Sequence, residues 1–165
     1  DKYTSDFLNK INLKYIVLCE NLYVSGMGAG GIPNHKMKTI IINTNFDEYI
    51  LGRIIHHELF HIVNENYKTY FNKNIWTKFN NSKFNYAECS TCTDKLDLSL
   101  LNNGDGFITE YSMSTASEDM AEVFSILMVD KQKIQDKALK DPILNKKILF
   151  IKKNILKIDE NFKFN

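Results

Sequence analysis

The longest hydrophobic pattern with helical spacing lies in residues 47–67. Asp47 is a favourable N-cap, and apolar side chains follow it three and four residues apart, which predicts one amphipathic helix with a buried stripe. The stripe consists of Ile50, Leu51, Ile54, Ile55, Leu59, Ile62 and Val63. The β-branched residues 38–43 precede this helix and predict a strand. That strand either belongs to the core or forms the edge of a cleft, where an extended peptide could pair with it.

Shorter patterns precede this strand. A short helix capped by Thr4 or Ser5 is expected near the N-terminus, followed by residues 14–24, which are rich in Ile, Val, Leu and Tyr. We expect a strand in residues 14–24, although their periodicity also fits a continued helix. The glycine-rich residues 25–33 contain no Lys followed by Ser or Thr, so they predict a flexible turn near the cleft instead of a phosphate loop.

Two further helices are expected in the C-terminal half. Residues 117–124 open the first, and Asp141-Pro142 starts the second with proline in its first turn. Apolar residues of the second helix recur at 4-3-4-3 spacing, which favours packing on its own domain over a coiled-coil seam for a partner. These residues are Leu144, Ile148, Ile151, Ile155 and Ile158. The whole pattern predicts an α+β fold that is mostly helical with a small sheet.

Length and charge limit the function classes. A chain of 165 residues is expected to form a single domain spanning residues 1–165, and we expect a monomer. The 21 basic and 20 acidic residues leave a formal charge of +1, so no overall field attracts nucleic acid. We therefore interpret the aromatic-rich residues 68–110 as an insertion that packs over the cleft, not as a nucleic-acid surface. No apolar run approaches the roughly 20 residues that a membrane span requires.

The three cysteines do not form a complete disulfide framework. Cys89 and Cys92 form a CxxC motif, and Cys19 lies far from them in the sequence. The CxxC motif could form a disulfide, remain as two free thiols or belong to a second metal site. A structural zinc site would need a second pair of ligands.

The chemistry of the chain is concentrated in His57-Glu58-Leu59-Phe60-His61, an HExxH motif inside the predicted helix of residues 47–67. Residues four apart lie on one face of a helix, so His57 and His61 can bind the same metal ion. Catalytic zinc takes three protein ligands and leaves a fourth position for water. Glu58 is then placed to accept a proton from that water. His56 cannot replace His57, because the residue four positions later is Phe60.

A third ligand is expected from the helix that begins near residue 117. Glu118 and Glu122 are four residues apart on one face of it. Glu118 would complete a His-His-Glu set for one zinc ion, and Glu122 would then fix the tautomer of an imidazole. Asp119, which points about 100° away from Glu118, remains the alternative third ligand.

These motifs carry a resemblance to a known group of enzymes. Tyr111 followed by Glu118 and Glu122, together with the HExxH motif, is similar to the catalytic domain of anthrax lethal factor and the related Pro-Pro endopeptidases. These are gluzincin-type zinc metallopeptidases, and small bacterial zinc metallopeptidases share the layout. The resemblance implies a zincin-like fold, peptide or protein substrates, and a secreted or cell-surface location. It also implies that His57, His61 and Glu118 bind zinc, that Glu58 is the general base, and that Tyr111 stabilises the oxyanion.

The chain departs from that group in the long, cysteine-bearing residues 68–110, which lie between the two ligand helices. Two other classes therefore stay open. One is an interaction module that holds zinc without hydrolysis, which the presence of Glu58 disfavours. The other is a toxin-like effector or surface factor, whose partner would be held by the C-terminal helix and the aromatic insertion.

Overall fold

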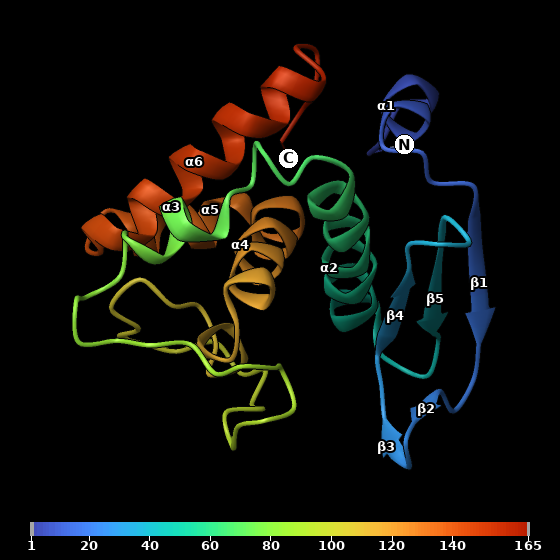
Figure 1. Cartoon of the computed structure of the whole chain (residues 1–165), viewed down its shortest axis with the longest axis horizontal. Coiled ribbons are helices and arrows are strands. Elements are labelled where there is room, and N and C mark those ends of the chain that lie inside the picture. Colours follow the sequence, from blue (N-terminus) through green and yellow to red (C-terminus); the bar gives the residue numbers. More distant parts are fainter. Residues whose placement is uncertain (1, 165) are drawn as a thin grey trace.

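Two helices cross the middle of the molecule. The computed structural model describes residues 2–164, in which α2 (Glu48–Asn66) packs beside α4 (Ala116–Val129). The sheet lies on the side of α2 that faces away from α4, and α6 (Pro142–Ile158) lies beyond α4 (Figure 1). Helix α5 (Lys131–Ala138), which the sequence pattern did not predict, connects α4 to α6.

The main sheet has three strands in the order β1 (Tyr15–Cys19), β5 (Thr39–Asn43), β4 (Gly31–Asn34). Strand β5 pairs parallel with β1 and antiparallel with β4. The strand predicted at residues 38–43 is therefore the central one, and the interpretation of it as the edge of the cleft was wrong. The turn predicted for residues 25–33 was also wrong in part, because the edge strand β4 begins at Gly31.

Local capping explains where several helices begin. The Asp47 side chain accepts a hydrogen bond from the backbone N–H of Ile50 at 3.0 Å, and Thr115 caps α4 in the same way through the N–H of Glu118. Thr4 caps α1 (Ser5–Lys10), and Asp141 caps α6 ahead of Pro142. The helix starts predicted at Thr4, Asp47 and Asp141 are confirmed.

The strand expected in residues 14–24 is confirmed as β1, followed by a separate hairpin of β2 (Tyr23–Val24) and β3 (Met27–Gly28). A short helix, α3 (Lys73–Thr77), lies within residues 68–110, and a 3₁₀ turn, η1 (Tyr111–Met113), precedes α4. Within residues 2–164, no helix combines the length and apolar composition that crossing a bilayer requires.

The core has one large part and one small part. The large part joins α1, α2, α4 and α6 through residues such as Phe7, Phe60 and Phe124, and it includes the whole apolar stripe of α6. Helix α6 therefore packs on its own domain, as its spacing predicted. The small part, Ile40, Ile42 and Ile62, joins the sheet to α2. Helix α2 is thus held on both sides, and this fixes the orientation of its histidines.

Candidate metal centre

The structure brings the side chains of His57, His61 and Glu118 together between α2 and α4. Nε2 of His57 is 3.1 Å from Nε2 of His61, and both lie near Oε2 of Glu118, at 2.9 and 3.2 Å. The two histidines come from successive turns of α2, and Glu118 comes from the first turn of α4. Among residues 2–164, these three side chains form the one group with metal-binding geometry.

The triangle of donor atoms fits a zinc ion. Four ligands placed tetrahedrally at about 2.05 Å from zinc are about 3.3 Å from one another. The observed edges of 2.9, 3.1 and 3.2 Å are close to this value. Two imidazoles and a carboxylate are also a ligand set that zinc accepts. The residues present therefore fit the metal.

Glu122 holds His57 from the side opposite the donor triangle. Nδ1 of His57 is 2.9 Å from Oε1 of Glu122, so a proton on Nδ1 leaves Nε2 free to act as a ligand. Arg53 donates to Oε2 of Glu122 at 2.9 Å, and Thr109 donates to the same oxygen at 2.9 Å. The sequence interpretation missed Arg53 and Thr109. The signal for Arg53 was its position four residues before His57, on the histidine face of a buried helix.

Charge coupling in this cluster shifts three pKa values. Burial disfavours the imidazolium of His57, but hydrogen bonds to Glu118 and Glu122 outweigh burial and raise the pKa of His57 well above its ordinary value. Burial opposes ionisation of both carboxyls too, yet the neighbouring imidazoles hold the pKa of Glu118 well below its ordinary value, and His57 and Arg53 lower that of Glu122. The cluster therefore stabilises a positive charge between its carboxylates, and zinc can replace that proton.

Glu58 is enclosed between α2 and the edge strand. A methyl group added at Gly31 of β4 would lie only 2.8 Å from the Glu58 carboxyl carbon and 2.9 Å from Oε1. Within residues 2–164, Oε2 of Glu58 is buried and has no hydrogen-bond partner. Burial raises the pKa of Glu58. Oε2 of Glu58 is therefore available to accept a proton, which suits a group that exchanges protons.

Tyr111 faces the same space from η1. Its ring centroid is 6.0 Å from that of His57, and both residues line one cavity. Burial and the nearby charge of Glu118 raise the pKa of Tyr111. The phenol therefore keeps its proton near neutral pH and can donate a hydrogen bond.

Asp119, the alternative third ligand, points away from the histidines. Its Oδ2 accepts hydrogen bonds from Lys147 of α6 at 2.6 Å and from Trp76 of α3 at 2.8 Å. Tyr86 donates to the same oxygen at 2.5 Å. The geometry therefore favours Glu118 over Asp119 as the third ligand.

A cavity of about 620 Å³ opens in front of the donor triangle. Strand β4 and the β2–β3 hairpin border it on one side, and residues 90–98 of the predicted insertion border it on the other. Its lining is largely apolar and includes Met27, Ile32, Ile50, Ile54, Leu96 and Leu98.

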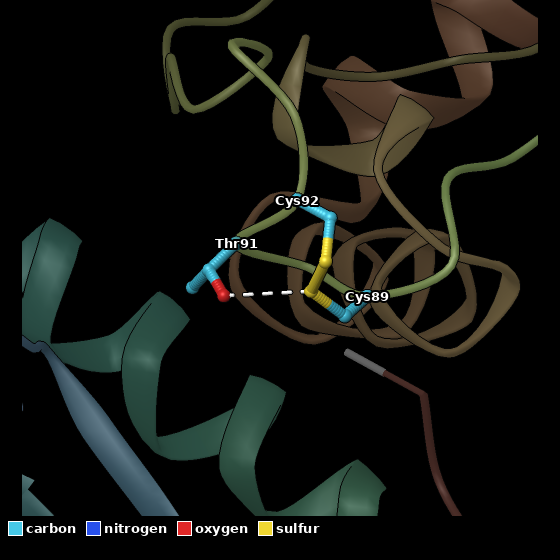
Figure 2. The surroundings of a disulfide bond; sticks show 3 residues. All are labelled: Cys89, Thr91 and Cys92. Atoms are coloured by element: carbon cyan, nitrogen blue, oxygen red, sulfur yellow. Dashed lines mark hydrogen bonds between the residues drawn. A yellow bond between two sulfur atoms is a disulfide. The ribbon is translucent and has the colours of Figure 1, made fainter.

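The CxxC motif lies at the rim of this cavity. Cys89 and Cys92 form a disulfide, and the two residues between them, Ser90 and Thr91, line the cavity (Figure 2). In Figure 2 this tight loop faces the ribbon of α2. Of the three alternatives that the sequence left open for the CxxC motif, the structure has the disulfide, and Cys19 is a free thiol.

Two comparisons connect this geometry to known proteins. A family model described as "Putative zinc-binding metallo-peptidase" matches residues 33–161. A crystal structure titled as a "putative zinc-binding metallo-peptidase" from Bacteroides caccae ATCC 43185 is similar, with a TM-score of 0.59 and 20% identity over 92% of this chain and 61% of that chain. This chain thus corresponds to less than two thirds of that protein, and the likeness confirms the α+β fold. No curated protein matches the chain.

Proposed function

The chain belongs to the family of zinc-binding metallo-peptidases that its residues 33–161 match, and we propose that it is a zinc-dependent endopeptidase. The observation that carries this proposal is the triangle of His57, His61 and Glu118, whose edges match a tetrahedral zinc site, beside the unpartnered Glu58 carboxylate. The third ligand is then a glutamate from the second helix, which is the gluzincin arrangement.

His57, His61 and Glu118 would hold one zinc ion, and Glu122 with Arg53 would hold His57 in its ligand tautomer. When bound, zinc supplies a water of lowered pKa and a Lewis acid for the peptide carbonyl. His57 is buried and the side chains of His61 and Glu118 are largely enclosed between the two helices, so the three donors need little rearrangement to bind the ion.

Glu58 acts as the general base and then as the general acid. Its raised pKa brings it closer to the working pH, which makes it a better proton acceptor from water and a better donor to the leaving nitrogen. Its buried Oε2 has no partner within residues 2–164, so no existing hydrogen bond has to break before proton transfer.

Tyr111 donates a hydrogen bond to the oxyanion. Its phenol keeps its proton because burial and the charge of Glu118 raise its pKa. Such a donor stabilises charge that develops only in the transition state, so it increases turnover without being needed for metal binding.

The substrate is an extended peptide that pairs with the open edge of β4. This strand runs in the same direction as α2, because Gly30, just before the strand, lies against Ile54, while His35, just after it, shares a second pocket with His61. An antiparallel peptide would then run from the His61 side toward Ile54. The apolar walls formed by Ile50, Ile54 and Leu98 favour an apolar residue on the C-terminal side of the cleaved bond.

The alternative of a non-catalytic zinc module is disfavoured by Glu58. A structural site closes its metal with protein ligands and has no use for a buried, unpartnered carboxylate beside it. The Cys89–Cys92 disulfide supports a further part of the proposal, that the protein works in an oxidising compartment such as the cell surface or the exterior.

A peptide-library digestion with zinc analysis tests the function. The protein should cleave internal bonds, and Glu58→Gln should retain about one zinc per chain while losing at least about 10³ of the turnover. Tyr111→Phe should also keep zinc and lose about 10²–10³ of turnover. Cleavage by Glu58→Gln at the wild-type rate would overturn the proposed mechanism. Full zinc content without cleavage of any library peptide by the wild type would favour the non-catalytic module.

A further inference from the structure

The outer strand of the sheet exposes an apolar edge that the proposed function does not use. Strand β1 lies at the end of the sheet opposite β4 (Figure 1), and none of its residues lines the cavity. Four of its five residues are largely exposed: Tyr15 by 60%, Ile16 by 52%, Val17 by 45% and Leu18 by 64%. These side chains point alternately to the two faces of the sheet, so neither face of β1 is covered.

The main-chain groups on the outer side of β1 are also available. The N–H of Tyr15 and the C=O of Cys19 bond to the chain of β5 and the residues that flank it. In a parallel ladder alternate residues bond to opposite sides, so Ile16 and Leu18 present their N–H and C=O groups outward. Edge strands are normally protected by a charge, a proline or a bulge within the strand. The five residues of β1 contain no charge and no proline.

We propose that β1 pairs antiparallel with β1 of a second copy of this chain, which joins the two sheets into one of six strands. A two-fold axis through Val17 places Val17 opposite its own copy and Ile16 opposite Leu18. Ile16 and Leu18 are the residues with outward N–H and C=O groups, so each Ile16–Leu18 pair forms both hydrogen bonds of an antiparallel ladder. An interface in which the same patch meets itself is the usual basis of a homodimer.

Charge complementarity selects this partner and this register. The exposed Lys14 precedes β1 and the exposed Glu20 follows it. In the register centred on Val17, Lys14 of each chain faces Glu20 of the other, which gives two ion pairs at the ends of an apolar strand. A shift of the two-fold axis to Ile16 or Leu18 would lose both ion pairs. The pairing leaves the cavity beside β4 open, so it is independent of the proposed peptidase activity, and it replaces the monomer expected from the sequence.

Sedimentation equilibrium from about 1 µM to about 1 mM tests the proposal. The wild type should show a reversible monomer–dimer equilibrium. Lys14→Glu should weaken the dimer by about tenfold or more, because both ion pairs become repulsive. Adding Glu20→Lys to Lys14→Glu should restore it. The matched charge reversals Lys153→Glu and Glu160→Lys, at exposed positions on and after α6, should leave the equilibrium unchanged. Circular dichroism confirms that each variant is folded.

Cross-linking gives a second measurement that does not depend on the charge variants. In a Cys19→Ser background, Val17→Cys should form a covalent dimer on mild oxidation, whereas Ile16→Cys should not, since Ile16 faces Leu18. A monomeric wild type across the whole range would overturn the proposal. A dimer indifferent to Lys14→Glu, or equal cross-linking at residues 16 and 17, would overturn it too.

Discussion

Helix α4 carries carboxylates on two of its faces, and their partners differ. On the face toward α2, Glu118 and Glu122 meet two imidazoles and one guanidinium, and the cluster opens into the cavity. On the face toward α6, Asp119 meets Lys147, and both side chains are fully buried. Imidazole nitrogens can give up a proton and bind a metal, whereas an ammonium and the N–H of an indole can only donate. The type of partner, and not the carboxylate itself, therefore separates a reactive site from a structural one.

The strongest test of this comparison is to substitute the two neighbouring acids, Glu118 and Asp119, separately and to compare the results. Glu118→Ala should abolish stoichiometric zinc binding and reduce peptidase activity by at least about 10³, because only two imidazoles remain as ligands. Asp119→Asn should keep its zinc and lose stability instead. Zinc content by mass spectrometry and the free energy of unfolding, measured on both variants, separate the two roles. Zinc loss in Asp119→Asn alone would reverse the assignment of the ligand.

The second test removes the cation from the closed face. Lys147→Met leaves Asp119 buried with only two neutral donors, so the free energy of unfolding should fall by about 3 kcal/mol. Lys146→Met, one residue earlier and exposed, serves as the matched control and should change stability by less than about 0.5 kcal/mol. Urea unfolding of the zinc-free proteins measures both. An equal effect of the two substitutions would show that the buried pair has no special role.

Two neighbouring histidines of α2 allow the same comparison. His56 is next to His57 in the sequence, but it faces Tyr3 and not carboxylates, and its Nδ1 is 2.6 Å from the Tyr3 hydroxyl. Burial, with the charge of Lys2, lowers the pKa of His56 to about 4. Since an unfolded histidine titrates near 6.5, only the unfolded state binds this proton between about pH 6.5 and pH 4. Stability should therefore fall across that window as the pH falls, by about 2–3 kcal/mol in total. In His56→Gln this part of the acid-induced loss should disappear from urea titrations at pH 7 and pH 4.5. The same slope in both proteins would exclude His56 as its source.

The smallest expected effect concerns the support of a ligand. Glu122→Gln keeps the shape of the side chain but weakens its hold on His57 and Arg53, so zinc affinity should fall by about 10–100-fold while stoichiometric binding persists at high zinc. A competition titration with a chromophoric chelator measures the change. Unaltered affinity would mean that α2 alone orients His57.

Local signals in the sequence were enough for the helix starts at Thr4, Asp47 and Asp141, but not for the short helices α3 and α5 or for the arrangement of the site. Asp47 as a cap and the HExxH spacing are properties of one continuous segment, so the sequence predicted them correctly. The apolar stripe is buried only in its second half, because Ile50, Leu51, Ile54 and Ile55 are partly exposed and two of them, Ile50 and Ile54, line the cavity. The choice between Glu118 and Asp119 depends on which face of α4 meets α2, and that depends on Lys147 in α6, 28 residues beyond Asp119 in the chain. Spacing alone contains no such long-range information.

The sheet was the least predictable part for the same reason. Residues 25–33 have the composition of a turn, and Gly31 becomes part of β4 only because β5 offers it a ladder of hydrogen bonds. Residue 31 must also lack a side chain, because Glu58 of α2 occupies the space that a Cβ atom would need. Strand order and these contacts across elements are set by tertiary packing and not by local preference.

Gly31 also limits how this protein can be altered. Any side chain there would clash with the Glu58 carboxyl group, so a substitution at residue 31 affects the proposed base before it affects substrate choice. Directed evolution toward new peptides would therefore find little benefit at this position, even though it lines the cavity at the start of β4, the strand proposed to pair with the substrate. Ile32, Leu96 and Leu98 line the same cavity, and the practical route to a changed preference is to randomise those three positions and leave the glycine in place.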